Sequence, residues 1–451
     1  MVDLPLDVLL LILDNITVSA LITGDYEDLF QCALTCKSLT KPALSSLYQT
    51  PPRDLEEPRL SINEENNARK CANMWRSIIL SMCKDRTYLP YYEYIKSFYL
   101  GSLRDMLSRS INEDLDELMH RENEDVGGKR LKLSKGDLTA TTAMDILCPL
   151  IFKKAYKITK LVGNVGKDDC FPLRAWVSHL PNLQSLSLSH SYLLGDNAQE
   201  SICEHCPSFK ELNVNYWACD YQAECVLKGL RPNSLTSFGV AFSYGPCVIR
   251  AIGCHSKSLT TLTLPSLPRV AFIELPTIGA FEALETLRIF RLSPETCSGE
   301  MIPAVAKWIY HCKNLLYLDL SFAWRTSCIE TLMLAVGELN QLRKLQLWDR
   351  GSPAQLRALP RLPNLETLNF HGKDMDDDIW PSFFGLEKLT TLRLYGTSKF
   401  TARGILDFIS QLGPGNKGIY ITVRINDKFS EEEVAAIKDT LEQKARGTFD
   451  Y

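Results

Sequence analysis

The residues that could carry bond-making or metal chemistry are few in this sequence. Asp374 to Asp378 is the densest acidic cluster, but it lacks the glycine and the distal glutamate of a calcium-binding loop, so we expect a solvated turn. Cys203 and Cys206 have C-x-x-C spacing without a second pair nearby. A structural zinc site normally needs four ligands, so a zinc or redox role is the less favoured reading of this pair.

Catalytic signatures are also missing. The seven histidines form no ligand set. The chain has no phosphate-binding G-x-x-x-x-G-K-[ST] segment, no H-E-x-x-H helix and no G-x-S-x-G elbow. We therefore expect a protein that is not an enzyme and that uses no metal or other cofactor. An enzyme with an unfamiliar active site is the alternative.

A second group of side chains suits binding to another protein. Arginine and aromatic residues dominate binding hot spots, and arginine pairs well with carboxylate or phosphate. We assign substrate binding to ten residues of the later part of the chain: Arg288, Phe290, Tyr317, Asp319, Arg343, Lys344, Trp348, His371, Arg393 and Tyr395. We expect them to bind a protein substrate through an acidic or phosphorylated segment. The alternative is that they only solvate a sheet and stack on one another.

A repeated pattern must position these residues. The pattern apolar-x-x-apolar-x-apolar recurs nine times, beginning at Leu183, Phe209, Leu235, Leu259, Leu284, Leu315, Leu342, Leu365 and Leu389. Most of the separations lie in the range of 20–29 residues typical of leucine-rich repeats. The three apolar positions would face inward on a short strand, with the residues between them facing outward. One repeat cannot bury its own apolar face, so the repeats must stack on one another.

The stacked repeats predict an α/β fold, a leucine-rich-repeat solenoid with a curved parallel sheet and helices on its convex side. Weaker copies of the pattern end at Leu100, Leu133 and Leu161. Cys206 and Cys312 each precede a repeat by three residues, which resembles the cysteine-containing repeats common in F-box proteins. We therefore expect these two cysteines to be buried thiols.

The outward positions differ between early and late repeats. In the early repeats they hold small residues: Gln184, Ser185, Ser187, Thr236, Ser237, Gly239, Thr260, Thr261 and Thr263. Small side chains offer little contact energy apiece. This contrast is why the later repeats are the predicted binding site.

The amino terminus has a different character. Leu4-Pro5-Leu6-Asp7 opens an apolar run, and the segments from Asp28 to Leu39 and from Leu44 to Tyr48 follow at helical spacing, which predicts three short helices. The opening L-P-x-acid, the D-L-apolar segment, the A-L-x-C-K core and the closing L-Y resemble an F-box in this order.

The resemblance implies a small all-α F-box that docks a Skp-type adaptor and, through it, a cullin. The apolar positions that match the motif are Leu4, Pro5, Val8, Leu9, Ile12 and Leu34. The chain would then be the substrate receptor of an SCF-type ubiquitin ligase, which acts by proximity and not by bond chemistry of its own. The alternative is a leucine-rich-repeat scaffold whose helical amino terminus is only a cap.

These patterns divide the chain into four parts. Residues 1–49 are the F-box, 50–90 a linker and connecting helix, 91–428 the solenoid and 429–451 a C-terminal capping helix. In the last part Ser430 and Glu433 have capping-box spacing. Val434, Ile437 and Leu441 would cover the last repeat.

Composition narrows the cellular setting. The chain has 451 residues, of which 45% are hydrophobic and 23% charged, as in an ordinary folded protein. The net charge of -4 supplies no global attraction to nucleic acid or to an anionic membrane, so we expect neither as a partner. The run from Val8 to Leu13 is far too short for a membrane span, and fifteen cysteines in so long a chain suggest reduced structural thiols. We expect a cytoplasmic and/or nuclear protein.

Overall fold

The computed structural model describes most of the chain. The described residues are 5–23, 26–35, 37–49, 64–82, 87, 89–110, 139–163, 171–195, 197–242, 245–264, 267–292, 302–322, 326–351, 356, 359, 361–424 and 429–451. By their internal contacts, the residues form two compact units, Met1–Leu212 and Asn213–Tyr451. In the described part, thirteen strands follow one another in chain order in a parallel sheet, with helices between them, so the fold is the predicted α/β leucine-rich-repeat solenoid.

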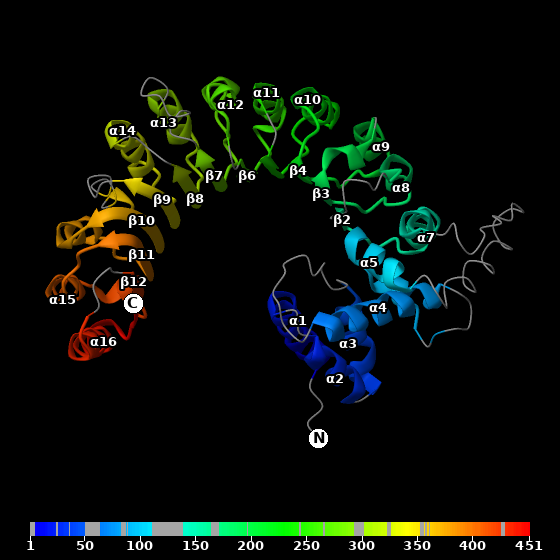
Figure 1. The fold of residues 1–451 in the computed structure, drawn as a ribbon, viewed down its shortest axis with the longest axis horizontal. Coiled ribbons are helices and arrows are strands. Elements are labelled where there is room, and N and C mark those ends of the chain that lie inside the picture. The colour runs from blue at the N-terminus through cyan, green and yellow to red at the C-terminus, as the bar shows by residue number, and fades with distance from the viewer. Residues whose placement is uncertain are drawn as a thin grey trace, which may run out of the picture. The chain divides into compact units, whose positions relative to one another are not determined.

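Four helices open the first unit: α1 (Leu6–Thr23), α2 (Glu27–Thr35), α3 (Lys37–Gln49) and α4 (Glu64–Ser81). The helices α1 and α2 both pack on α3 (Figure 1). The helix α1 has 18 residues, so it is longer than the short helix that the sequence predicts. The helix α4 lies within residues 50–90, where a linker and a connecting helix are expected.

The rest of the first unit starts the sheet. Its elements are η1 (Tyr91–Tyr94), β1 (Ser97–Tyr99), α5 (Leu100–Ser110), α7 (Ala140–Lys154), β2 (Lys160–Gly163), α8 (Leu173–Val177), β3 (Ser185–His190), η2 (Ser191–Leu194) and α9 (Ala198–His205). Phe98 of β1 lies opposite Leu161 of β2, which lies opposite Leu186 of β3. The strand β1 pairs directly with β2. The expected strand ending at Leu133 lies outside the described residues.

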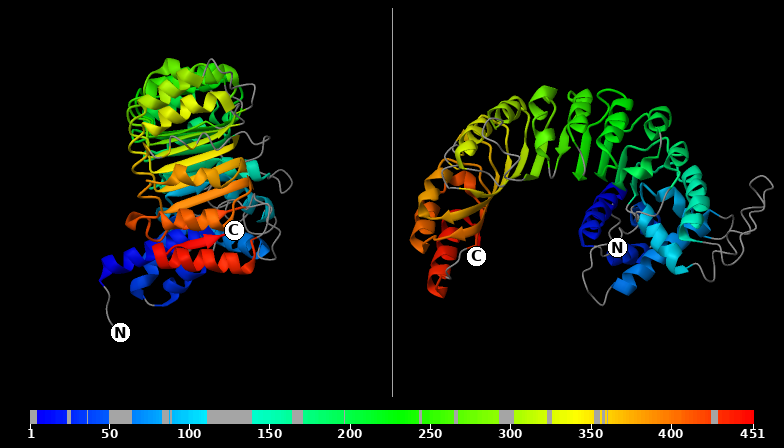
Figure 2. Two further views of the ribbon diagram at one scale, coloured as in Figure 1. Left: turned by 90° about the vertical axis from the view of Figure 1, so that its left-hand side faces the viewer. Right: turned by 45° about the horizontal axis from the view of Figure 1, so that its top comes forward.

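The strand β4 (Glu211–Tyr216) crosses the division, and the second unit continues with β5 to β13. Up to the seventh repeat its elements are α10 (Asp220–Gly229), β5 (Ser237–Phe242), α11 (Pro246–Ile252), η3 (Gly253–His255), β6 (Thr261–Thr263), α12 (Arg269–Phe272), η4 (Leu275–Ile278), β7 (Thr286–Leu292), α13 (Ile302–His311), β8 (Tyr317–Phe322), α14 (Thr326–Gly337) and β9 (Lys344–Gly351). The remaining elements are β10 (Thr367–Met375), η6 (Asp377–Phe383), β11 (Thr391–Ser398), α15 (Ala402–Ser410), η7 (Pro414–Asn416), β12 (Tyr420–Val423), α16 (Glu431–Ala445) and β13 (Thr448–Asp450). Within this unit the helices lie along the outer side of the strands (Figures 1 and 2).

The core of the solenoid is the repeated apolar pattern. All three apolar positions are buried in each of the nine repeats, from Leu183, Leu186 and Leu188 to Leu389, Leu392 and Leu394. The register aligns equivalent positions on neighbouring strands, as for Leu345, Leu368 and Leu392. The repeat prediction is therefore confirmed position by position.

Polar side chains tie successive repeats together. Asn182, Asn314 and Asn364 each donate a hydrogen bond of 2.7–2.8 Å to a main-chain carbonyl of the preceding repeat. Asp220 of α10 accepts the main-chain N–H groups of Gly245, Cys247 and Val248 at 2.8–3.1 Å and so caps α11 from outside. Burial acts to raise the pKa of Asp220, but these N–H donors lower it below its usual value.

The C-terminal end contains the expected capping helix. The Ser430 N–H donates to Glu433 Oε2 at 2.8 Å, and the Glu433 N–H donates to Ser430 Oγ at 3.2 Å, which is the predicted capping box of α16. Val434, Ile437 and Leu441 are buried, as expected. The sequence reading missed the strand β13, which follows this helix and pairs with β12, so residues 429–451 are not a helix alone.

Candidate protein-binding surfaces

The first candidate surface is a set of exposed apolar side chains on α1 and α2. We call it the N-terminal apolar face: Val8, Leu10, Leu11 and Ile12 of α1 with Phe30 and Leu34 of α2. Leu11 and Leu34 are the most exposed, at 64% and 65%. Phe30 and Leu34 are four residues apart on α2, so they share one side of that helix.

The predicted adaptor-binding residues fall unevenly on this face. Pro5, Val8, Ile12 and Leu34 are exposed, whereas Leu9 is half-buried and Leu4 lies outside the described residues. Sequence reasoning missed Leu10, Leu11 and Phe30. Since α1 is apolar on nearly every side, its sequence alone could not tell the exposed positions from Leu13, which is buried.

Other elements of the first unit cover the first strand of the solenoid. Trp75 of α4 is fully buried and packs edge-on against Phe98 of β1, with ring centroids 5.0 Å apart. Its indole N–H donates to Ser102 Oγ at 3.1 Å. The last residue of α3, Gln49, accepts the Lys96 N–H at 2.9 Å. The helices α3 and α4 thus contact the edge strand of the sheet through Gln49 and Trp75. The exposed apolar side chains of α1 and α2 take no part in these two contacts.

The second candidate surface lies on the late strands of the second unit. The register places Arg288, Asp319, Gln346, Asn369, Arg393 and Thr422 opposite one another on β7 to β12, and we call this line the inner row. These residues stand between the inward apolar positions, as the repeat pattern requires. The structure therefore brings most of the predicted substrate-binding residues onto one face.

Asp319 differs from the prediction, because it is only 4% exposed. Its Oδ2 lies 3.4 Å from Arg288 Nε, whereas its Oδ1 has no hydrogen-bond donor among the described residues. Burial raises the pKa of Asp319, and Arg288 and Tyr317 partly oppose that rise. Tyr317 lies under the Arg288 guanidinium, 5.8 Å from it, and donates to Gln346 at 3.0 Å. Asp319 therefore contacts Arg288 and is almost fully shielded from solvent.

Three aromatic rings lie side by side on β9, β10 and β11. Trp348, His371 and Tyr395 occupy the same register position. Trp348 is parallel to Tyr395 within 7°, with ring centroids 5.9 Å apart, and lies 5.8 Å from His371. Trp348 is 38% exposed. The stacking that the alternative interpretation expects is present, and it leaves Trp348 partly accessible.

The remaining predicted residues are basic or undescribed. Arg343 pairs with Glu366 at 3.5 Å. Arg393 lies over the Tyr420 ring at 5.5 Å, and Lys344 is exposed on β9. The backbone of Phe290 lies on β7 opposite Ser321, and its side chain is outside what the structure describes.

The early strands are less uniform than predicted. Thr261 and Thr263 lie on β6 opposite Ser237 and Gly239 of β5, as the pattern requires. However, Tyr216 and Phe242 stack with centroids 4.7 Å apart and an interplanar angle of 12°, and Tyr216 is 40% exposed. They stand two residues beyond the last apolar position of their repeats, which is the signal that would have found them.

The thiols behave as structural groups. Cys206 is buried and donates to the Leu180 carbonyl at 3.3 Å, and Cys312 donates to the Trp308 carbonyl at 3.5 Å. Burial raises the pKa of Cys312 to about 11. Cys203 and Cys206 are both free thiols. Within the described ranges, no group of three or more histidine, cysteine or acidic side chains is placed to hold a metal ion.

The acidic cluster is mostly exposed between β10 and η6, as expected of a solvated turn, but Asp377 also makes specific contacts. Asp374 belongs to β10, and Asp376 caps η6. Asp377 accepts the Thr401 hydroxyl at 2.6 Å and the Trp380 indole N–H at 3.1 Å. Its role is to join two repeats.

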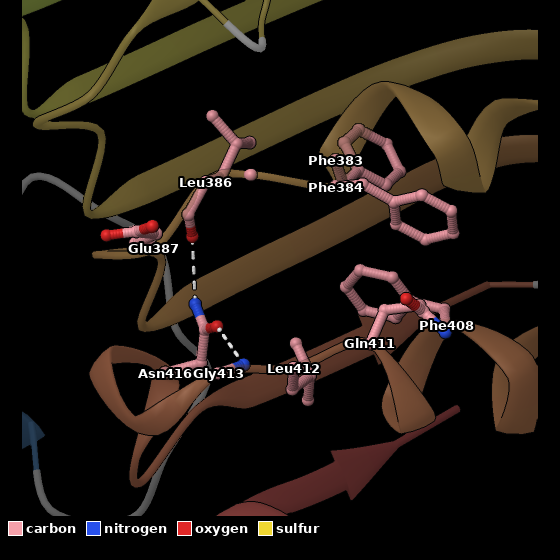
Figure 3. A pocket seen from close by; sticks show the side chains of 10 residues that line it. Phe383, Phe384, Leu386, Glu387, Phe408, Gln411, Leu412, Gly413 and Asn416 are labelled. Atoms are coloured by element: carbon pink, nitrogen blue, oxygen red, sulfur yellow. Dashed lines mark hydrogen bonds between the residues drawn. The ribbon is translucent and has the colours of Figure 1, made fainter.

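A glycine-rich spacing also escaped the sequence reading. Gly413, Gly415 and Gly418 have the G-x-G-x-x-G spacing of dinucleotide-binding turns, but here the glycines follow a helix and precede a strand, the reverse of the order that motif requires. Asn416 accepts the Gly413 N–H at 3.0 Å and donates to the Leu386 carbonyl at 2.9 Å (Figure 3). The adjoining cavity, of about 180 Å³, is lined mainly by aromatic and aliphatic side chains such as Phe384 and Phe408. The turn is therefore structural.

Comparisons with known proteins find only low similarity to this chain. No family model matches the chain, and no curated protein does. Among solved structures, the yeast Rad7 and Elc1 complex aligns at 15% identity and a TM-score of 0.41, covering 71% of this chain and 91% of that one. An internalin from Listeria monocytogenes aligns at 13% identity and a TM-score of 0.32, covering 75% and 95%. The mouse RP105/MD-1 complex aligns at 16% identity and a TM-score of 0.36, covering 65% and 56%.

None of the helices in the described ranges is both long enough and apolar enough to cross a membrane.

Proposed function

We propose that this chain is the substrate receptor of an SCF-type ubiquitin ligase. The N-terminal apolar face would dock a Skp-type adaptor and through it a cullin, and the late strands would hold a target protein. No catalytic residue is assigned, because the receptor acts by bringing the target close to the ubiquitin-conjugating enzyme.

The observation that carries the proposal is the exposure of six large apolar side chains on two adjacent helices. Clustered apolar exposure on a folded protein marks an interaction site more often than it marks an ordinary surface. A helix that served only as a cap would bury such residues against the repeats. Here α3 and α4 supply the contacts to the edge of the sheet, through Gln49 and Trp75.

Affinity purification of the full chain from proteasome-inhibited cells tests this function. We expect the intact chain to recover a Skp-type adaptor, a cullin and a target protein. The double substitution Leu11→Glu and Leu34→Glu should remove the adaptor and the cullin while keeping the target, since the two leucines lie on α1 and α2 and not on the late strands.

A matched control is Leu334→Glu, which alters an exposed leucine of α14 in the second unit. It should leave adaptor recovery unchanged. Recovery of the target without adaptor or cullin from the intact chain would instead favour a scaffold with no ligase role.

A further inference from the structure

Several basic side chains on or next to the late strands already have a carboxylate partner. Arg288 pairs with Asp319, Arg343 with Glu366 at 3.5 Å, and Arg424 with Asp450 at 3.7 Å. Among the described late-strand residues, Lys344 and Arg393 form no ion pair and no hydrogen bond through their side chains. Among the side chains that the structure describes on these strands, the unpaired positive charge is therefore located at these two positions.

The surroundings of Arg393 leave its donors unused. Arg393 stands in the inner row between Asn369 and Thr422. Asn369 Oδ1 and Thr422 Oγ1 are both buried without a hydrogen-bond partner in the described structure, although an arginine adjoins them. The guanidinium lies instead over the Tyr420 ring, at 5.5 Å. A guanidinium has five N–H donors and matches a carboxylate in two-point geometry.

The aromatic ring of Tyr395 lies close to Arg393 on the same strand. Tyr395 follows Arg393 by two residues on β11, so both side chains face the same way and their Cα atoms are about 6.6 Å apart. The Tyr395 ring is parallel to that of Trp348, which is 38% exposed. Charge and aromatic surface are thus offered together, on one strand.

We propose that this late-strand site, made of Lys344, Trp348, His371, Arg393 and Tyr395, binds an extended acidic peptide segment of the target. A carboxylate of the segment meets Arg393, and an aromatic side chain two positions away meets the Trp348–Tyr395 stack. An extended peptide presents residues i and i+2 on one side at the same spacing of about 6.6 Å, so the two contacts form together. The inference rests on the proposed function, because it names the class of target.

The distribution of charge favours a carboxylate over a phosphate. Phosphate carries close to two negative charges and is typically bound by clustered arginines. Among the described side chains, Arg288, Arg343 and Arg424 pair with Asp319, Glu366 and Asp450, whereas Arg393 has no carboxylate partner. Lys344 lies two strands away on β9, about 10 Å across the sheet, where it adds attraction for a second acidic residue.

The test uses short glycine- and serine-based peptides fixed to a surface at high density, with binding of the fluorescently labelled full chain as readout. The probes carry Glu-Ala-Phe, Phe-Ala-Glu, Glu-Ala-Ala, Ala-Ala-Phe or phosphoserine-Ala-Phe. We expect one of the two peptides with both anchors to bind at least about tenfold better than either peptide with a single anchor. Arg393→Glu should reduce this binding about tenfold or more, and a Lys-Ala-Phe peptide or its reverse should restore it.

Arg343→Glu is the matched control, because that arginine is the chain neighbour of Lys344 but already pairs with Glu366, and it should change binding less than about threefold. Equal losses from Arg343→Glu and Arg393→Glu would overturn the site. Tighter binding of the phosphoserine peptide by tenfold or more would overturn the choice of a carboxylate, and no binding of any probe would overturn the proposal. Adaptor recovery by the same protein is measured separately, so failure of this site and failure of the receptor function are distinguishable.

Discussion

Helices lie at both ends of this chain, and they treat their apolar side chains in opposite ways. In α16, Ile437 and Leu441 are completely buried against the last repeat. In α1, by contrast, Leu11 is 64% exposed, and its neighbours Leu10 and Ile12 are each 43% exposed. A helix that caps a solenoid buries its apolar stripe, as α16 does. The apolar residues of α1 are therefore better explained by a partner than by a cap.

The sequences of α1 and α16 also differ in the pattern of their apolar residues. The apolar residues of α16 recur at i, i+3 and i+7 with acidic residues in the first turn, which specifies one buried side. The sequence of α1 is apolar on nearly all sides. In the described part of α1, Leu13 is buried, whereas Leu10, Leu11 and Ile12 are exposed.

The largest effect is expected from the buried side of α16. Ile437→Ala should lower the free energy of unfolding by about 3 kcal/mol, because it removes a fully buried side chain and leaves a cavity. Urea unfolding followed by circular dichroism measures this. Lys438→Ala, at the next, exposed position, should change the free energy by less than about 0.5 kcal/mol. Similar effects of the two substitutions on the free energy of unfolding would contradict the conclusion that α16 caps the solenoid by burying Ile437.

A smaller effect is expected from the cap that α10 provides for α11. Asp220→Ala should cost about 2 kcal/mol at pH 7, since three main-chain N–H groups lose a charged acceptor. The folded pKa of Asp220 is lowered, so its stabilisation is fully present above the unfolded value of about 3.9 and is lost as the pH falls through the folded value. Thermal unfolding from pH 7 down to pH 3 should therefore show the variant and the original converging at the acidic end. A constant difference over this range would contradict the assigned role.

The capping box of α16 should contribute less to the free energy of unfolding than the cap that Asp220 provides. Ser430→Ala should lower the free energy of unfolding by about 1 kcal/mol, because the hydroxyl accepts a single N–H group at an exposed helix end. The change should also speed hydrogen exchange in the first turn of α16. Unchanged exchange there would mean that packing alone fixes this helix.

The smallest stability effect is expected on the N-terminal apolar face. Leu11→Glu should change the free energy of unfolding by less than about 0.5 kcal/mol, because the side chain is already mostly in solvent. The same urea titration as for Ile437→Ala provides the measurement. A loss of 2 kcal/mol or more would show that α1 packs as a cap after all.

The sequence predicted the repeats well because alternation between buried and exposed positions is a local signal. Every inward position from Leu183 to Leu394 was read correctly. The strand β13 escaped, because Thr448 to Asp450 contains one apolar residue, Phe449, and gains its strand structure only by pairing with β12.

The candidate sites were less predictable, because they depend on neighbours distant in the sequence. The sequence analysis assigned Asp319 to the binding surface. In the structure Asp319 is buried beside Arg288 and Tyr317, which interact with its carboxylate. The sequence around Arg393 does not reveal either that this arginine lacks a carboxylate partner. It follows from the absence of an acidic residue at the matching positions of β10 and β12, where Asn369 and Thr422 stand.

The most direct test of the account is the binding of a purified Skp-type adaptor to the purified full chain, measured by calorimetry. The account predicts a one-to-one complex that Leu11→Glu and Leu34→Glu each weaken about 30-fold or more, as expected for hot-spot residues, while Leu334→Glu changes the affinity less than about twofold. An intact chain that forms no complex, or a Leu11→Glu and Leu34→Glu double variant that binds as tightly as the original, would contradict it.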